Sequence, residues 1–391
     1  MNNKTALLIV ENNFNLTHVG VRRVIRFYWS QLINAGYTVT LASPSNGNFL
    51  TCSDVDAKNS MLPKKNDERD IEPTWKSNAP TYKPEHTNPT IHNPALNQVS
   101  WKLDKNISPD SFDLSIITAP WICADRGALR EAKYSIGIVY DMVPNLLAIG
   151  ALRMPRYVNA YEFAHQHSLG YDFYLRNVKK ITCISESTKR DFLSFYGKRV
   201  EPRIAVSIPF QDFGDGRANE EISDSVLLIN VLDHRKNFAA VSAVIKKTTS
   251  LKPVSLIIVG TERMPVTEVT TFLGEMSEIC ENVEWYRSPS DWQLEQLMKR
   301  CKVLFFPSIY EGLGLPILEA QAKGLPVISS NNSSCEEINL NPELTADPYD
   351  HDVFAEILTK VLDGTSSYLS GESLRSCQNS FLSKKNTIPL I

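Results

Sequence analysis

Short apolar runs alternate with longer amphipathic stretches along most of this chain. Each apolar run is followed by a polar or glycine-bearing turn, which is the order expected of buried parallel strands joined by helices. The first example is a strand at residues 6–10, a turn at 11–17, a helix at 21–33 and a strand at 38–42. Further strands are predicted at 112–118, 134–141, 181–185, 204–209, 226–232, 253–260, 282–286, 303–306 and 325–330. The pattern therefore predicts a doubly wound α/β protein.

The chain length of 391 residues exceeds what one hydrophobic core usually supports, so two domains are expected. We place an N-terminal domain at residues 1–210 and a C-terminal domain at 211–391, with a polar, glycine-bearing hinge at 211–223. Residues 44–110 interrupt the first domain with eight prolines and many asparagines, lysines and aspartates. This Pro/Asn-rich insertion is either a surface excursion or a segment that closes over a ligand.

The composition, with 42% hydrophobic and 22% charged residues, is that of an ordinary globular protein. No apolar run approaches the roughly 18 to 20 residues that span a bilayer, so we expect a cytoplasmic protein. The seven cysteines form no Cys-x-x-Cys pair, which favours buried thiols over disulfides or a zinc site.

Charge is divided unevenly along the chain, whose net charge is −3. Residues 1–200 are net basic and residues 201–391 are net acidic, which argues against general nucleic-acid binding. The first helix carries a basic cluster of Arg22, Arg23 and Arg26. Its two interpretations are a solvated helix face and contact with phosphate or lipid head groups at the inner face of a membrane.

The most informative stretch is residues 303–330, in which a strand leads through a glycine loop into a helix. Glu311 and Glu319 stand eight positions apart, and Gly312 and Gly314 lie between them. Unpaired amides of such a loop and of the first helical turn form an anion site. Carboxylates beside that site would accept hydrogen bonds from sugar hydroxyls. The alternative is a structural turn in which Glu319 only complements the helix dipole.

This stretch, with Glu-Gly-Leu-Gly-Leu-Pro at 311–316, Leu-Glu-Ala at 318–320 and Gly-Leu-Pro-Val-Ile at 324–328, resembles the signature of retaining glycosyltransferases of family 4. The resemblance implies the GT-B fold, in which two Rossmann-like domains face each other across a cleft. It also implies that Glu311 contacts the donor sugar and Glu319 the ribose of a nucleotide. The loop residues implied to supply amides to the donor are Gly312, Leu313, Gly314 and Leu315.

A second candidate element is the basic turn after the strand at 226–232, which carries Arg235 and Lys236. Positive charge there would stabilise a diphosphate leaving group, although a surface basic turn is the alternative. The family has an arginine after this strand and a lysine five positions later. Lys236 matches the lysine, Val231 replaces the arginine, and we expect Arg235 to compensate. The resemblance also places Arg287 near the nucleotide base.

In the first domain, Asp141 follows the strand at 134–141, at an edge where α/β sheets bind ligands. We interpret it as an acceptor-side catalytic group or as a turn and helix-capping residue. The family often has a histidine where this chain has Tyr140. In the family a glycine-rich turn after the first strand approaches the donor phosphates or the acceptor. Gly20 matches its first glycine and Arg23 its arginine, and Arg22 replaces a second glycine.

The resemblance implies a metal-independent, retaining hexosyltransferase that moves a sugar from a nucleotide diphosphate sugar to an acceptor hydroxyl. The acceptor would be a glycan or a lipid-linked glycan in surface polysaccharide biosynthesis, and no cofactor is expected beyond the donor substrate. Family members usually end in a long helix that returns to the first domain, and this chain resembles a shortened version. Alternatives are a non-catalytic sugar-nucleotide sensor, a GT-B epimerase, and a phosphorylase, for which we identify no pyridoxal lysine.

Overall fold

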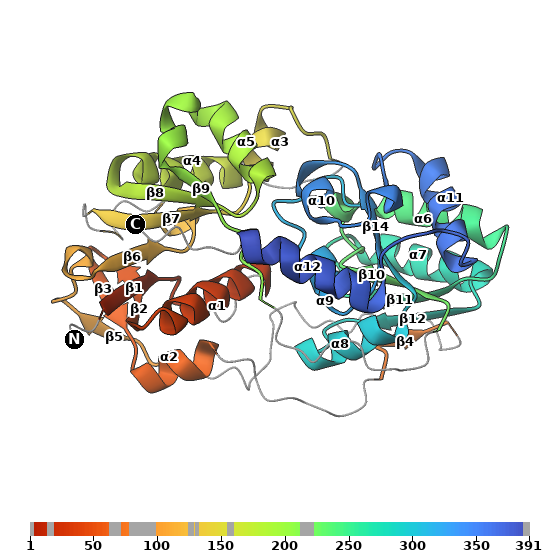
Figure 1. Ribbon diagram of the computed structural model, residues 1–391, viewed down its shortest axis with the longest axis horizontal. Helices are drawn as coiled ribbons and strands as arrows, with labels where there is room; N and C mark the ends of the chain where they lie inside the picture. Colours follow the sequence, from red (N-terminus) through yellow and green to blue (C-terminus); the bar gives the residue numbers. More distant parts are fainter. Residues whose placement is uncertain are drawn as a thin grey trace.

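A computed structural model describes residues 4–13, 19–61, 72–77, 99–123, 129, 133–154, 160–211 and 223–385. Within them the chain forms two α/β units, each with a central sheet covered by helices (Figure 1). Most of the predicted hinge and parts of the 44–110 insertion lie outside the described residues.

The first sheet has eight strands in the order β5-β3-β2-β1-β6-β7-β8-β9. Its central strands are parallel, and Ile9 of β1 lies opposite Ala42 of β2 and Ile117 of β6. The strands β3 and β5 add an antiparallel edge. The bounds are β1 (Lys4–Ile9), β2 (Tyr37–Ser45), β3 (Asn48–Thr51), β5 (Lys102–Asp104), β6 (Leu114–Ile117), β7 (Tyr134–Val139), β8 (Val178–Cys183) and β9 (Ile204–Val206).

The helices of this unit are α1 (Val19–Asn34), α2 (Asp54–Met61), α3 (Val143–Ala148), α4 (Ala160–Asn177) and α5 (Glu186–Tyr196). Helix α1 buries an apolar stripe that includes Val24, Phe27 and Tyr28. Ser185 is the N-cap of α5, because its side chain accepts a hydrogen bond from the Thr188 amide.

The second sheet has the order β15-β14-β13-β10-β11-β12-β4. Its edge strand β4 comes from the first half of the chain, and Trp75 of β4 lies opposite Trp285 of β12. Part of the 44–110 segment therefore belongs to the second sheet, where the Trp75 side chain is buried. The bounds are β4 (Trp75–Lys76), β10 (Ser225–Ile229), β11 (Ser255–Val259), β12 (Asn282–Tyr286), β13 (Val303–Phe306), β14 (Val327–Ser330) and β15 (Thr345–Ala346).

The helices of the second unit are α6 (Phe238–Thr249), α7 (Val266–Ile279), α8 (Asp291–Arg300), α9 (Leu315–Ala322), α10 (Ser333–Ile338), α11 (His351–Leu362) and α12 (Gly371–Lys385). Helix α12 lies between the two units and packs against α9 (Figure 1). At its end, the Lys385 carbonyl accepts a 3.2 Å hydrogen bond from the Ile208 amide of the first unit. A final helix therefore reaches the first unit, and whether it is shorter than usual in the family remains a prediction.

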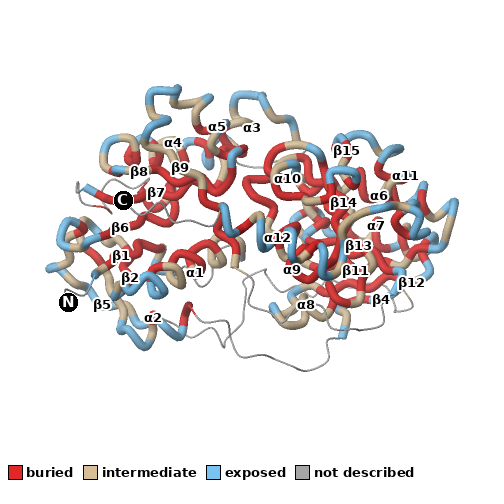
Figure 2. The backbone as a smooth tube through the Cα atoms, viewed as in Figure 1, coloured by how far each residue is buried: buried red, intermediate tan, exposed pale blue. Residues whose placement is uncertain are grey.

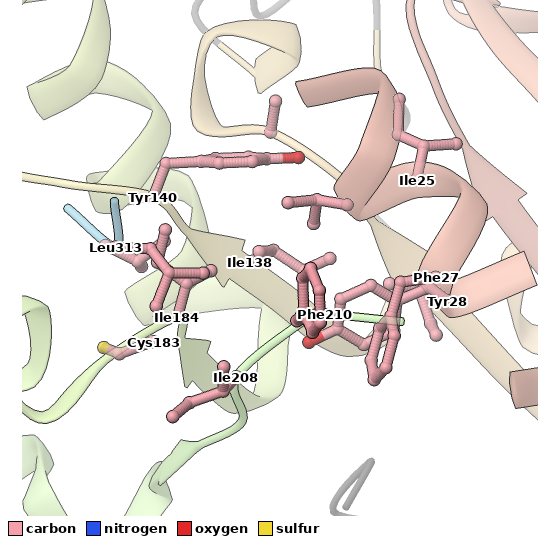
Figure 3. Close-up of a cluster of buried hydrophobic side chains, with 14 of the residues drawn as sticks. Ile25, Phe27, Tyr28, Ile138, Tyr140, Cys183, Ile184, Ile208, Phe210 and Leu313 are labelled. Atoms are coloured by element: carbon pink, nitrogen blue, oxygen red, sulfur yellow. The ribbon is translucent and has the colours of Figure 1, made fainter. Parts of the chain in front are cut away.

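Buried residues fill both sheets and continue between the two units (Figure 2). One apolar cluster contains residues of both units: Leu313 of the second lies beside Tyr140 and Ile184 of the first (Figure 3). The contact between the units is therefore partly hydrophobic, which favours a closely apposed arrangement.

Candidate functional site

Glu311 lies in the loop between β13 and α9, and its backbone is held by α10. The Glu311 amide donates to Ser333 Oγ at 3.1 Å, and Ser334 Oγ donates to the Glu311 carbonyl at 3.0 Å. Gly314 adopts a left-handed φ of 84° where the loop enters α9, a conformation that glycine tolerates best. The glycine and the two serines fix where the Glu311 side chain begins.

The Glu311 carboxylate is 6% exposed and accepts three hydrogen bonds. Arg235 Nη1 donates at 2.9 Å, Ser308 Oγ donates at 2.5 Å, and Lys236 Nζ is the third donor. Burial raises the pKa of Glu311, but the charges of Arg235 and Lys236 and these hydrogen bonds outweigh it and lower the pKa to about 2. Glu311 is therefore ionised at neutral pH.

The two cations come from the turn that follows β10. Asp233 begins this turn, and its side chain accepts a 2.8 Å hydrogen bond from the Arg235 amide. Lys236 Nζ lies 4.6 Å from the centre of the Phe306 ring. Burial lowers the pKa of both cations; for Arg235 the charge of Glu311 more than reverses this, whereas for Lys236 the net shift is downward.

These three side chains place two cations against one carboxylate in a buried setting. Asp233 acts on both cations and Asp141 on Arg235, so an anionic ligand would have to take over part of the contacts that these carboxylates now make. The structure thus brings together the predicted residues Glu311, Arg235 and Lys236, although 75 positions separate Lys236 from Glu311.

The glycine loop lies against the first unit. The Gly312 carbonyl accepts hydrogen bonds from Ser185 Oγ at 2.6 Å and from Thr188 Oγ1 at 3.1 Å. A Cβ at Gly312 would lie 2.8 Å from the Asp141 Cβ and closer still to the Tyr140 carbonyl oxygen. The other predicted loop residues follow directly, and Leu313 is buried whereas Leu315 is partly buried.

Asp141 stabilises the turn that precedes α3, and its charge also acts on the cationic turn. Its Oδ1 accepts a 3.0 Å hydrogen bond from the Val143 amide at the start of α3. Its charge contributes to raising the pKa of Arg235 in the other unit, after the larger contribution of Glu311. This contact supports the turn interpretation, because the N-cap residue of α3 is Met142, and an acceptor-side role remains a prediction.

Gly20 lies in the first turn of α1, and residues 14–18, which would complete the predicted glycine turn, are outside the described part. One helical turn later, Arg23 pairs with Glu319 of α9 and with Asp291 of α8 at 2.9 Å. Glu319, predicted at a ribose, thus has an intramolecular cation as its partner. Arg26 also points to Asp291, at 3.9 Å. Membrane contact through Arg22, Arg23 and Arg26 remains a prediction, which sedimentation with anionic liposomes at low salt would test.

Arg287 follows β12, and its guanidinium binds Glu262 through Nε at 3.0 Å and Nη2 at 2.7 Å. Contact of Arg287 with a nucleotide base remains a prediction. It requires either that the Arg287–Glu262 pair opens or that both side chains contact the base together.

Sequence reasoning missed several residues that join the units or support Glu311. The Tyr310 hydroxyl donates to Asp191, and the Glu337 carboxylate accepts from the amides of Glu186 and Ser187 at 2.9 and 3.3 Å. Of these residues, only Ser308 could have been found from the sequence, because it immediately follows the strand that leads to Glu311. The others depend on how the units meet.

Among the described residues, no cluster of three or more His, Cys, Asp or Glu side chains could hold a metal ion. In the same part of the chain, no helix is both long and apolar enough to cross a membrane. Two surface cavities, of about 620 Å³ between α6 and α7 and about 420 Å³ beside α11, are lined by none of the predicted site residues.

Comparison with solved structures identifies the fold. The chain aligns over 98% of its length with 95% of sucrose-phosphate synthase from Thermosynechococcus elongatus, with a TM-score of 0.60 and 13% identity. The Anabaena protein HepE, solved in complex with UDP, aligns over the same shares of both chains, with a TM-score of 0.60 and 12% identity. The predicted fold class, α/β with two Rossmann-like domains, is confirmed.

Sequence comparison finds similar bacterial proteins over shorter spans. The chain is 43% identical over 74 residues to the O-antigen chain mannosyltransferase B of Escherichia coli, which is 19% of each protein. It is 31% identical over 238 residues to the serotype-specific mannosyltransferase WbdA of Escherichia coli, covering 55% of this chain and 28% of that protein. The matches therefore span under a third of these relatives' lengths.

A family model matches most of the unit that carries Glu311. Residues 216–375 match the model described as glycosyl transferases group 1, and this span contains the cationic turn and the glycine loop. The chain therefore has the GT-B fold, and its second domain matches the glycosyl transferases group 1 family.

Proposed function

We propose that this protein is a glycosyltransferase that moves a sugar from a nucleotide diphosphate sugar to an acceptor hydroxyl in the biosynthesis of a surface polysaccharide. The observation that carries the proposal is the buried Glu311 carboxylate held by Arg235 and Lys236. The family match over the same residues and the mannosyltransferase relatives support it.

In this proposal the donor diphosphate enters beside the cationic turn. Phosphate oxygens then accept hydrogen bonds from Arg235 and Lys236 in place of Glu311. The Glu311 carboxylate accepts a hydrogen bond from a hydroxyl of the donor sugar instead. The bond between the anomeric carbon and the phosphate oxygen breaks with its electron pair on the phosphate. The two cations stabilise that charge without a metal ion.

The acceptor hydroxyl forms the new bond to the anomeric carbon on the face that the phosphate leaves, so the configuration is retained. Its proton passes to the leaving phosphate oxygen. Among the described residues, we see no side chain placed to act as a covalent nucleophile on the anomeric carbon: Glu311 is engaged by three donors and Asp141 by the Val143 amide.

The relatives are named as mannosyltransferases, so mannose is the first sugar to test. A thermal-shift screen with UDP, GDP, ADP and dTDP sugars identifies the donor. Incubation of that donor with mannose-containing acceptors should release nucleotide only when acceptor is present, and NMR of the product should show the anomeric configuration of the donor. Tight donor binding without turnover across the panel would overturn the proposal in favour of a sensor.

A further inference from the structure

Three aromatic side chains meet at one edge of the first sheet, beside the glycine loop. Trp121 follows β6, Tyr140 follows β7, and His167 lies on α4. The Trp121 ring centre is 5.6 Å from each of the other two, and its plane is within 23° of the His167 ring. Tyr140 and His167 are buried and Trp121 is half-buried, so Trp121 is the most exposed of the three rings.

Two carboxylates border these rings. Glu11 follows β1, and Asp141 follows Tyr140. Burial raises the pKa of Glu11, and hydrogen bonding with Trp121 partly offsets the rise. Burial lowers the pKa of His167, and the charge of Asp141 only partly offsets this. Because β1, β6 and β7 are neighbours in the sheet, the topology brings the residues after them to one edge, where α/β sheets bind ligands.

Two buried polar atoms of the cluster lack a partner among the described residues. They are the Tyr140 hydroxyl and His167 Nδ1, on side chains that are 8% and 9% exposed. Buried polar atoms are rarely left without a hydrogen bond, so a bound water or a group that enters the cluster would be needed to satisfy each of them.

The cluster is held rigidly from behind by α4. A Cβ at Gly170 would lie 2.9 Å from Pro120 Cα and closer still to the Pro120 carbonyl oxygen, so the helix packs directly on the turn that carries Trp121. The Tyr171 hydroxyl donates to the Asp141 carbonyl at 2.8 Å. Rigid placement of this kind is typical of a binding site.

We propose that Trp121, Tyr140 and His167, with Glu11 and Asp141, form a subsite that binds a neutral pyranose unit of the acceptor glycan. The apolar face of the sugar stacks on Trp121, and its hydroxyls donate to the two carboxylates. Two carboxylates disfavour phosphate or an anionic lipid head group. The inference rests on the proposed function, because it assigns the acceptor of the same reaction.

The position of the subsite fits that reaction. The glycine loop that leads from Glu311 passes within contact distance of Asp141 and the Tyr140 carbonyl. A sugar bound at Asp141 would therefore present a hydroxyl toward the donor side of the cleft.

The test is binding of α-1,2-mannobiose, α-1,3-mannobiose and maltose to the full chain with nucleotide diphosphate present, measured by saturation-transfer NMR. Trp121→Phe should keep binding, and Trp121→Ala should weaken it about tenfold, because the stacking ring is lost; this corresponds to about 1.4 kcal/mol. Glu11→Gln, which is nearly isosteric, should also weaken it. The matched control is Tyr161→Ala, an aromatic on α4 that is 77% exposed and outside the cluster.

Unchanged binding in both Trp121→Ala and Glu11→Gln would overturn the subsite, as would competition by inorganic phosphate. Absence of saturation transfer from all three sugars to the wild-type protein would also overturn it. If Trp121→Ala fails to fold by circular dichroism, Glu11→Gln decides. Tight donor binding without turnover by the wild type would overturn the proposed function, while sugar binding would still decide the subsite.

Discussion

Replacing Gly312 by alanine tests how closely the two domains must approach for activity. The new Cβ would lie 2.8 Å from the Asp141 Cβ and closer to the Tyr140 carbonyl oxygen, whereas ordinary contact begins at 3.4 Å. One obstructing atom is backbone and the other is the first side-chain carbon, so neither can rotate away. The domains must therefore separate locally by about 1 Å.

This separation should affect both stability and catalysis. It lengthens the hydrogen bonds from Ser185 and Thr188 to the Gly312 carbonyl, which together are expected to contribute about 2 kcal/mol. A misplacement of about 1 Å between reacting groups can reduce turnover about 100-fold. Binding of the nucleotide diphosphate should change little, because Arg235 and Lys236 are both in the second domain.

The assay is a comparison of kcat for sugar transfer with the Kd of the nucleotide diphosphate, measured by calorimetry. Gly274→Ala is the matched control, because Gly274 lies in helix α7 and a Cβ there meets nothing within 4 Å. Gly274→Ala should keep full activity and a slightly raised melting temperature. A Gly312→Ala protein with kcat within twofold of the wild type would refute the idea that this close contact is required.

Three further predictions concern charged groups. The folded pKa of Glu311 is about 2, below its ordinary value, so the stability it contributes is present at neutral pH and is lost as pH falls from about 4.5 through 2. Glu311→Gln should therefore lower the free energy of unfolding at pH 7 by about 3 kcal/mol. It should also make that free energy less dependent on pH between pH 5 and 3. Equal urea midpoints of the variant and the wild type at pH 7 would contradict this. Arg23→Ala should tighten nucleotide binding two- to fivefold in a calorimetric titration, because it frees Glu319 from a partly exposed pair, and weaker binding would instead place Arg23 on the phosphates. Glu337→Gln should lower the melting temperature by a few degrees, because a charged acceptor at the start of α5 becomes neutral, and an unchanged value would show that this contact adds nothing.

Much of the fold could be predicted because strands buried on both faces are continuous apolar runs. The strand at 303–306 and the one at 282–286 were placed with the bounds that the structure shows. The edge strand β4 could not be predicted in this way. It is two residues long, and it is a strand because it pairs with β12 of the other domain, where Trp75 lies opposite Trp285.

The candidate site could be predicted only where local patterns carry it. Glycine spacing identified the loop around Glu311, and the end of a strand identified Lys236. The pairing of Arg23 with Glu319 joins residues that lie far apart in the chain, and it depends on domain apposition that no local pattern encodes. The return of α12 to Ile208 was missed for the same reason.

The most direct test of the donor site is the rate of acceptor-dependent nucleotide release by Lys236→Met, compared with Lys246→Met. Both substitutions remove a lysine of the second domain, but Lys246 pairs with Glu275 on the surface. If Lys236 stabilises the leaving diphosphate, Lys236→Met should lose about 100- to 1,000-fold in kcat while Lys246→Met keeps wild-type activity. Equal rates in the two variants would contradict the assignment of the buried cations to the reaction.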